Sequence, residues 1–120
     1  MIDEIIRIIA DIMDQDPHTI TPATYLVRDL GAQSIDLLEI GVAMQQHLGI
    51  PVQDDTLFLR DLRLVLLRAA DEKIAPEAAL AQRYPHLSAA RINAILADLN
   101  VGPVLQVADL AAYATAHARS

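Results

Sequence analysis

Apolar residues at helical spacing are the feature that most restricts how this chain can fold, and they are clearest at its N-terminus. Over the first 13 residues, apolar side chains recur every three or four positions, with acids and one arginine between them. These apolar positions are Ile2, Ile5, Ile6, Ile9, Ile12 and Met13. Such spacing places them on one side of an α-helix, whereas the side chains of a strand alternate. Because the apolar residues of the chain are mostly Leu, Ile and Ala and only 3% of all residues are aromatic, we expect an all-α fold.

The sequence predicts a long loop after this first helix, a second helix after the loop, and a last helix at the C-terminal end. The stretch 14–31 contains Pro17 and Pro22 and is too long for a simple turn. A helix is then expected to begin at or near Ser34 and to end at Gly49, just before a proline. Its apolar residues are Ile35, Leu38, Val42 and Leu48. The C-terminal stretch predicts a last helix with Val107, Leu110 and Tyr113 on one side.

Residues 57–103 follow a different pattern. The stretch 57–73 is expected to form one helix with two apolar faces. One face, predicted to be core, contains Phe58, Leu62, Val65, Leu66 and Ala69, and the other contains Leu57, Leu64 and Leu67 among arginines. Two short helices are predicted around Pro85, the second with Ser88 as its N-cap.

Length and charge limit the classes of function. A chain of 120 residues with 53% hydrophobic content predicts one folded domain. Its net charge of −7 is uneven, because residues 1–56 hold ten acids against two bases, and residues 57–103 hold five against six. An acidic surface repels phosphate backbones and attracts basic partners, so nucleic acid is disfavoured as the main partner. The absence of cysteine, of a signal peptide and of any membrane-spanning run favours a cytoplasmic protein without a membrane span.

Ser34 stands between a glycine turn and the second predicted helix, which leaves three interpretations. A serine before an apolar run is most often a helix cap. A nucleophile is disfavoured, because there is no Gly-x-Ser-x-Gly elbow and the four histidines are scattered. An attachment point is physically sensible, because a phosphodiester at a helix start is stabilised by free N–H groups and by the helix dipole.

The residues around Ser34 resemble the acyl carrier protein family. The family pattern Asp-Leu-Gly, two residues, Ser, Leu or Ile, Asp, two residues, Glu is met here by Asp29, Leu30, Gly31, Ser34, Ile35, Asp36 and Glu39. The match is good over residues 1–56 and moderate over the last helix. The resemblance implies a small helical bundle without catalytic activity. It also implies that Ser34 receives 4′-phosphopantetheine from coenzyme A, and that the arm carries an acyl chain as a thioester.

The same resemblance implies the partners. A phosphopantetheinyl transferase would add the arm, and acyl-transferring or condensing enzymes would use it in a specialised fatty-acid, lipid or polyketide-type pathway. Ile35 is expected to enter partner pockets, and Asp36 and Glu39 are expected to steer basic surfaces. Gln33 stands where the family usually has Asp. Further departures at Arg28, Gln45, Gln46 and His47 indicate a dedicated carrier with its own partner enzymes.

Residues 57–103 are interpreted as a helical insertion within a single carrier domain of residues 1–120. One hypothesis is that the insertion enlarges the apolar cavity for the acyl chain. Another is that its exposed leucines and Arg60, Arg63 and Arg68 dock a partner or a second copy. Two alternatives for the protein stay open: an unmodified adaptor, and nucleic-acid binding through a helix-turn-helix containing Arg83 and Arg91.

Overall fold

The computed structural model describes residues 1–118, which form seven α-helices and one short 3₁₀-helix. The elements are α1 (Ile2–Met13), η1 (Pro17–Thr19), α2 (Ser34–Leu48), α3 (Asp54–Leu57), α4 (Leu62–Asp71), α5 (Pro76–Arg83), α6 (Ala89–Asp98) and α7 (Val107–His117). The described residues contain no strand, and Tyr25 and Gln106 form an isolated antiparallel bridge. The predicted all-α fold is therefore confirmed.

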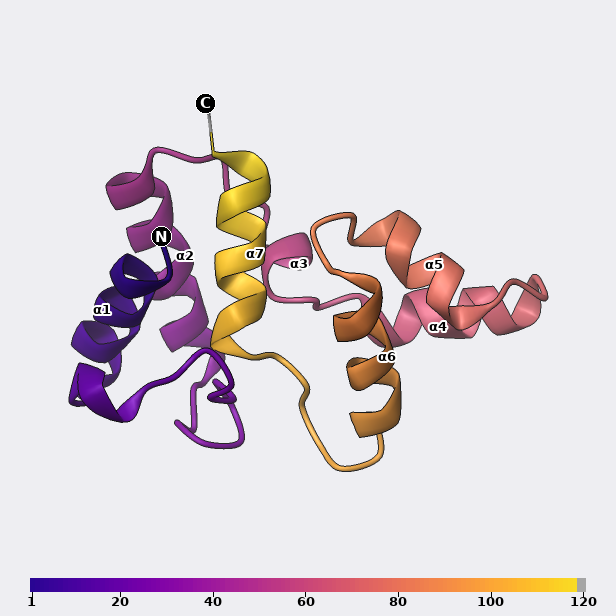
Figure 1. Ribbon diagram of the computed structural model, residues 1–120, viewed down its shortest axis with the longest axis horizontal. Coiled ribbons are helices and arrows are strands. Elements are labelled where there is room, and N and C mark those ends of the chain that lie inside the picture. The colour runs from indigo at the N-terminus through magenta and orange to yellow at the C-terminus, as the bar shows by residue number, and fades with distance from the viewer. Residues whose placement is uncertain (119–120) are drawn as a thin grey trace.

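The first and last helices pack as their sequence patterns predict. Ile5 and Ile9 of α1 are fully buried, and α1 contacts both α2 and α7. Val107, Leu110 and Tyr113 of α7 are also buried. Figure 1 shows these three helices together, with α4, α5 and α6 grouped on the other side of the molecule and α3 between the two groups. One continuous hydrophobic core includes buried residues from both groups.

The second helix has the predicted bounds, but its buried face is not the one that its large apolar residues suggest. Ile40 and Met44 are buried, whereas Ile35, Leu38 and Val42 are 56%, 47% and 49% exposed. The physical reason lies in Gly41, which allows α3 to approach closely. A Cβ at this position would lie 3.3 Å from Asp54 Oδ1 and 3.5 Å from the Phe58 ring. Because α1 and α3 together cover the side of α2 that contains Ile40, Gly41 and Met44, the apolar residues that face away from both helices stay exposed.

The predicted single helix over 57–73 is wrong at its start. The chain forms the short helix α3, then a turn, then α4. Leu59, within the turn, has a φ of 55°, which a continuous helix does not allow. The turn buries Leu57, Phe58 and Leu59 together, so Leu57 is a core residue and does not belong to the arginine-bearing face. Leu64 and Leu67 are exposed on α4, as predicted.

Two ion pairs fasten α5 and α6 to the rest of the molecule. The Arg91 guanidinium donates to both carboxylate oxygens of Asp109, at 2.7 and 2.9 Å, and to the Val104 carbonyl oxygen at 2.7 Å. Arg83 Nε donates to Asp61 at 2.7 Å, and the Tyr84 hydroxyl donates to the same carboxylate. Burial raises the pKa of Asp61, but the hydrogen bonds from Tyr84 and Arg83 lower it more, so the pKa lies below its ordinary value.

Two kinds of feature are absent from this part of the chain. None of the helices within residues 1–118 combines the length and the apolar character that crossing a membrane requires. The same residues contain no group of three or more His, Asp or Glu side chains arranged to hold a metal ion.

Candidate functional site

The loop before α2 is held in a defined shape by backbone hydrogen bonds, within itself and to the chain before α7. The Leu26 side chain is buried, and its N–H donates to the Leu105 carbonyl oxygen at 3.1 Å. The Ala32 N–H donates to the Leu26 carbonyl oxygen at 3.0 Å, and Gly31 between them has a φ of 68°. This left-handed conformation is more favourable for glycine than for other residues. The sequence Asp-Leu-Gly therefore produces a tight turn that leads directly into α2.

Ser34 is the first residue of α2, and its side chain is exposed. The N-cap position belongs to Gln33, so the interpretation of Ser34 as the cap is wrong. The Gln33 N–H donates to the Asp36 carboxylate at 2.8 Å, which closes the first turn without using the serine hydroxyl. The sequence-derived residues Gln33, Ser34, Ile35 and Asp36 thus lie together on this turn, and Glu39 is exposed one turn further along.

The surroundings of Ser34 suit a covalently bound phosphate. The first N–H groups of a helix have no partner within the helix, and the positive end of the helix dipole favours an anion there. A 15-residue helix begins at the serine, and the exposed hydroxyl leaves room for a bulky substituent. Asp36 is the acid on the same turn, and its carboxylate is engaged with the Gln33 N–H. The residues present therefore fit a phosphodiester on the serine oxygen.

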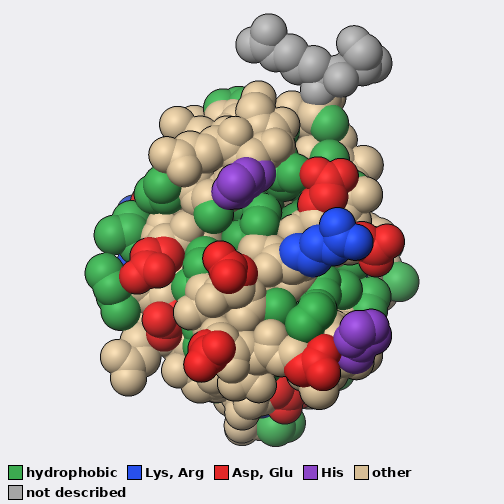
Figure 2. All heavy atoms as spheres, turned by 90° about the vertical axis from the view of Figure 1, so that its left-hand side faces the viewer, with side chains coloured by type: hydrophobic (Ala, Val, Ile, Leu, Met, Phe, Trp, Pro, Cys, Tyr) green, Lys and Arg blue, Asp and Glu red, His purple; other side chains and the backbone are tan. Residues whose placement is uncertain are grey.

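Ile35, Leu38 and Val42 form an exposed apolar row on α2 next to Asp36 and Glu39, and we call these five residues the acidic face of α2. The row continues for two turns from the serine. Figure 2 shows the side of the molecule that contains α1 and α2, where acidic side chains clearly outnumber basic ones. An apolar row bordered by acids is suited to a partner whose surface combines an apolar pocket with basic residues.

Arg28 connects the loop before Ser34 to the C-terminal end of α6. Its guanidinium donates to both carboxylate oxygens of Asp98, at 3.2 and 2.8 Å, and to the Gly102 carbonyl oxygen at 3.0 Å. The Tyr25 hydroxyl donates to the same Asp98 carboxylate at 2.7 Å, and the guanidinium lies 4.1 Å from the centre of the Tyr25 ring. The hydrogen bond from Arg28, followed by that from Tyr25, lowers the pKa of Asp98. Arg28, one of two basic residues in this acidic half of the chain, therefore has a structural partner within residues 57–103.

An apolar groove of about 230 Å³ lies one turn from the serine. Leu37 of α2 lines it, and the other walls come from the loop before α2, the turn between α3 and α4, α4 itself and the chain after α6. The wall residues outside α2 are Val27, Phe58, Leu59, Arg60, Leu62, Arg63, Leu99, Gly102, Pro103, Val104 and Leu105. Most of its lining therefore comes from residues 57–103.

The two arginines on which the nucleic-acid alternative depends are already engaged in ion pairs. Arg83 pairs with Asp61, and Arg91 pairs with Asp109, whose side chain is only 1% exposed. A phosphate backbone would have to compete with these carboxylates. The α5–α6 pair therefore offers no support for a helix-turn-helix function.

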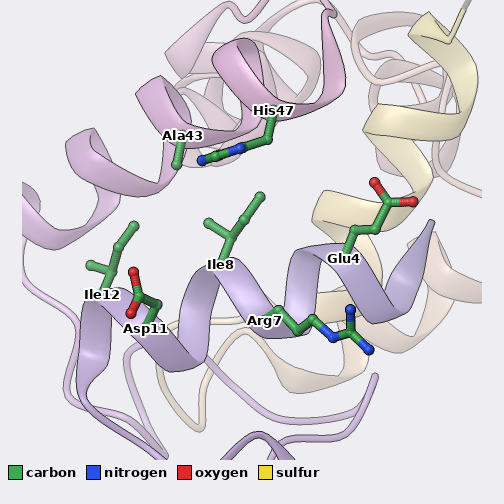
Figure 3. A pocket seen from close by; sticks show the side chains of 7 residues that line it. All are labelled: Glu4, Arg7, Ile8, Asp11, Ile12, Ala43 and His47. Carbon is green, nitrogen blue, oxygen red and sulfur yellow. The ribbon is translucent and has the colours of Figure 1, made fainter.

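A larger hollow of about 480 Å³ lies between α1 and α2. Figure 3 shows Ile8 and Ile12 of α1 pointing toward Ala43 and His47 of α2, while charged residues of α1 line its edge. It is remote from Ser34 along α2, since it begins nine residues further on, at Ala43. We therefore assign it no role in attachment.

The geometry defines a helical protein that presents an exposed serine at a helix start, beside an apolar row and an apolar groove. Comparison with known proteins identifies the class. The family described as "Phosphopantetheine attachment site" matches residues 3–65. The chain belongs to the acyl carrier protein family. Members of this family are carriers, not catalysts, and the match indicates covalently attached 4′-phosphopantetheine.

Several individual relatives support the same assignment. The acyl carrier protein AcpXL of Mesorhizobium japonicum is 42% identical over 50 residues, which is 42% of this chain and 54% of the relative. The acyl carrier protein of Nitratidesulfovibrio vulgaris is 38% identical over 53 residues, covering 44% and 70%. That of Helicobacter pylori is 31% identical over 55 residues, covering 46% and 70%. The chain thus spans about half the length of the first relative. No solved structure matches.

The site contains residues that the sequence alone did not identify. Tyr25, Asp98 and Gly102 hold the loop through Arg28, and Leu37 and Leu99 line the groove. A signal for the first group was available, since Arg28 is one of only two bases in residues 1–56. The groove residues had no such signal, because ordinary apolar residues at distant positions come together only in the fold.

Proposed function

We propose that this protein carries acyl intermediates on 4′-phosphopantetheine attached to Ser34, in a specialised fatty-acid, lipid or polyketide-type pathway of the cytoplasm. The observation that carries the proposal is the exposed Ser34 hydroxyl on the first turn of α2, directly after the ordered Asp-Leu-Gly turn. A phosphopantetheinyl transferase would direct the Ser34 oxygen to the phosphorus of coenzyme A. The serine would lose its proton and the nucleotide part of coenzyme A would leave. The attached group supplies a thiol for thioester formation.

The acidic face of α2 is the surface that we assign to partner enzymes. Ile35, Leu38 and Val42 offer apolar contacts, and Asp36 and Glu39 attract basic residues. Gln33 is exposed beside the serine and makes that position neutral. We infer that acyl-transferring or condensing enzymes of this pathway meet less negative charge there than on carriers with an acid at this position.

We propose a second role for residues 57–103, as an insertion within a single carrier domain. They provide most of the walls of the groove next to the serine, and we assign that groove to the acyl chain. At roughly 30 Å³ for a water-sized group, a volume of about 230 Å³ holds about eight such groups. Each methylene that leaves water contributes about 0.8 kcal/mol.

The attachment is tested by intact mass spectrometry after incubation with coenzyme A and a phosphopantetheinyl transferase. The wild-type chain should gain the mass of one phosphopantetheine group, and Ser34→Ala should gain none. Ser88→Ala is the matched control, because Ser88 is another exposed serine at the start of a helix, where its hydroxyl oxygen accepts from the Arg91 N–H at 3.1 Å. A wild-type chain that gains no mass with an active transferase would favour the alternative of an unmodified adaptor.

A further inference from the structure

The outer surface of α4 combines exposed leucines with arginines. Leu64 and Leu67 are 47% and 70% exposed. Arg63 and Arg68 are exposed on either side of them around the helix. We call these four residues the basic face of α4. A hollow of about 320 Å³ on this face is lined by Arg63, Leu66 and Leu67. The face thus has apolar residues at its centre and an arginine on either side, and it ends at the exposed Asp71.

Neither arginine forms an ion pair with another of the described residues. Arg63 donates one hydrogen bond to the Leu99 carbonyl oxygen at 3.2 Å, which orients its guanidinium without cancelling its charge. The four ion pairs found within the described residues involve His18, Arg28, Arg83 and Arg91 as cations. Both charges on the basic face are therefore available to an acidic partner.

The acidic face of α2 has the complementary composition. Its apolar residues Ile35, Leu38 and Val42 are about half exposed and recur at spacings of three and four, which forms a row along one side of the helix. Asp36 and Glu39 border this row. The hollow on α4 is large enough for an apolar side chain from such a row. Both faces are exposed in the same chain, so a contact between them must join two copies.

We propose that the basic face of α4 docks on the acidic face of α2 of a second copy of this chain. The uneven charge supports this partner, because residues 1–56 carry −8 and residues 57–103 carry +1. Because each contact joins two different faces, two reciprocal contacts about a two-fold axis would close a dimer, whereas single head-to-tail contacts would let copies add in a row. The association does not depend on modification of Ser34. A consequence that does rest on the proposed function is that association covers Ile35 and competes with enzymes for the same face.

The test is sedimentation velocity of the full chain over a wide concentration range, at low and high salt. The weight-average mass of the wild type should rise with concentration, and the rise should weaken at high salt because screening reduces attraction between exposed charges. Arg63→Glu/Arg68→Glu and, separately, Glu39→Arg should each weaken association by at least about tenfold, because each places like charges opposite one another. Arg7→Glu is the control, because Arg7 is exposed on α1 outside both faces. Circular dichroism checks that every variant keeps its helix content.

Mixing the two variants decides whether the two faces meet. The Arg63→Glu/Arg68→Glu chain keeps its acidic face, and the Glu39→Arg chain keeps its basic face. The two altered faces also carry opposite charges, so the mixture should recover the association that each variant loses on its own. A wild type that remains monomeric at every concentration would overturn the proposal. Association that persists in the charge variants would also overturn the proposal. Binding of the wild type to anionic lipid vesicles without self-association would overturn it as well.

Discussion

Arg28 is the residue that links the attachment loop most directly to residues 57–103. In the sequence it looks like a departure from the family, since an acid is common at its position. In the structure it bonds Asp98 and Gly102 and lies over the Tyr25 ring. An arginine at this position removes an acid that could attract a basic partner, but it adds an ion pair with Asp98 within the chain. We infer that the charge of Arg28 matters for the shape of the loop more than for the surface.

Replacing Arg28 by Met should release this contact and change a measurable property of Asp98. The pKa of Asp98 lies below its ordinary value of 3.8 because Arg28, and then Tyr25, donate to the carboxylate. Without Arg28, the pKa should rise toward 3.8, as followed by an NMR titration of the carboxyl carbon. The free energy of unfolding should also decrease, because a carboxylate with a lowered pKa stabilises the fold above its ordinary pKa and loses this contribution as pH falls through the folded value.

Arg68→Met is the matched control for this prediction. Arg68 is exposed and forms no ion pair with another described residue. The Arg68→Met variant should have an Asp98 titration and a thermal midpoint close to those of the wild type. An unchanged pKa of Asp98 in Arg28→Met would show that the pair is not formed in solution.

At the scale of the elements, the groove arises because α2, the turn before α4 and the chain after α6 converge next to the serine. None of these elements makes the groove alone. Leu37 comes from α2, Phe58 and Leu59 come from the turn that buries them, and Leu99 follows α6. The break in the helix at Leu59 is therefore what brings α4 to the groove wall.

Narrowing the groove should shorten the acyl chain that the protein shelters. In the wild-type holoprotein, each added methylene should raise the thermal midpoint until the groove is full. In Leu99→Phe, the rise should stop at a shorter chain, because the larger ring occupies part of the groove. Leu96→Phe is the control, since Leu96 is half-buried on α6 outside the groove. A thermal midpoint independent of acyl length in the wild type would contradict our assignment of the groove.

At the scale of the whole molecule, a row of rings joins the two groups of helices. His86 lies between Tyr84 and Tyr113, at ring-centre distances of 6.2 and 5.5 Å, and Tyr113 stacks on His117 at 4.0 Å. The Tyr113 hydroxyl donates to the Pro51 carbonyl oxygen at 2.9 Å, which extends the contact toward the end of α2. Neither ring nitrogen of His86 has a hydrogen-bond partner among the described residues.

This environment predicts a loss of stability in mild acid. Burial lowers the pKa of His86 below its ordinary value of 6.5, an effect opposed by Asp109 and reinforced by His117 and Arg83. The fold therefore favours neutral His86, whereas the unfolded chain binds a proton as pH falls below 6.5. The free energy of unfolding should therefore fall as pH decreases below 6.5, by at most about 1.4 kcal/mol per pH unit for one proton.

His86→Phe should flatten the pH dependence of stability, because phenylalanine preserves the ring contacts and cannot bind a proton. Urea unfolding at several pH values measures the effect, and His18→Phe is the control, since His18 is exposed and takes no part in this row of rings. An equal slope in His86→Phe and the wild type would assign the acid sensitivity to other groups.

Local patterns in the sequence predicted most elements but not how they pair. The spacing of apolar residues predicted α1 and α7 with their buried sides, and Ser88 predicted the start of α6. The apolar spacing gave a wrong prediction over 57–61, because a buried turn and an amphipathic helix can have the same apolar residues at these positions. It also did not show which side of α2 is buried, since Gly41 and the approach of α3 decide that.

The candidate site was predicted for similar reasons. Gln33, Ser34, Ile35, Asp36 and Glu39 are close in sequence, so their place on one helix followed from their spacing. The ion pairs of Arg28, Arg83 and Arg91 join residues far apart along the chain, and a single sequence gives no indication of such partners.

The packing of α1 against α7 has a consequence for how the chain is made. The two helices come from opposite ends of the described chain, so α1 cannot complete its packing until α7 has been synthesised. At about 5–20 residues per second, the ribosome leaves part of the apolar side of α1 uncovered for several seconds or more. During that interval α2, including Ser34, has already left the ribosome. Of α2 and α7, only α2 can therefore cover Ile5 and Ile9 until α7 emerges.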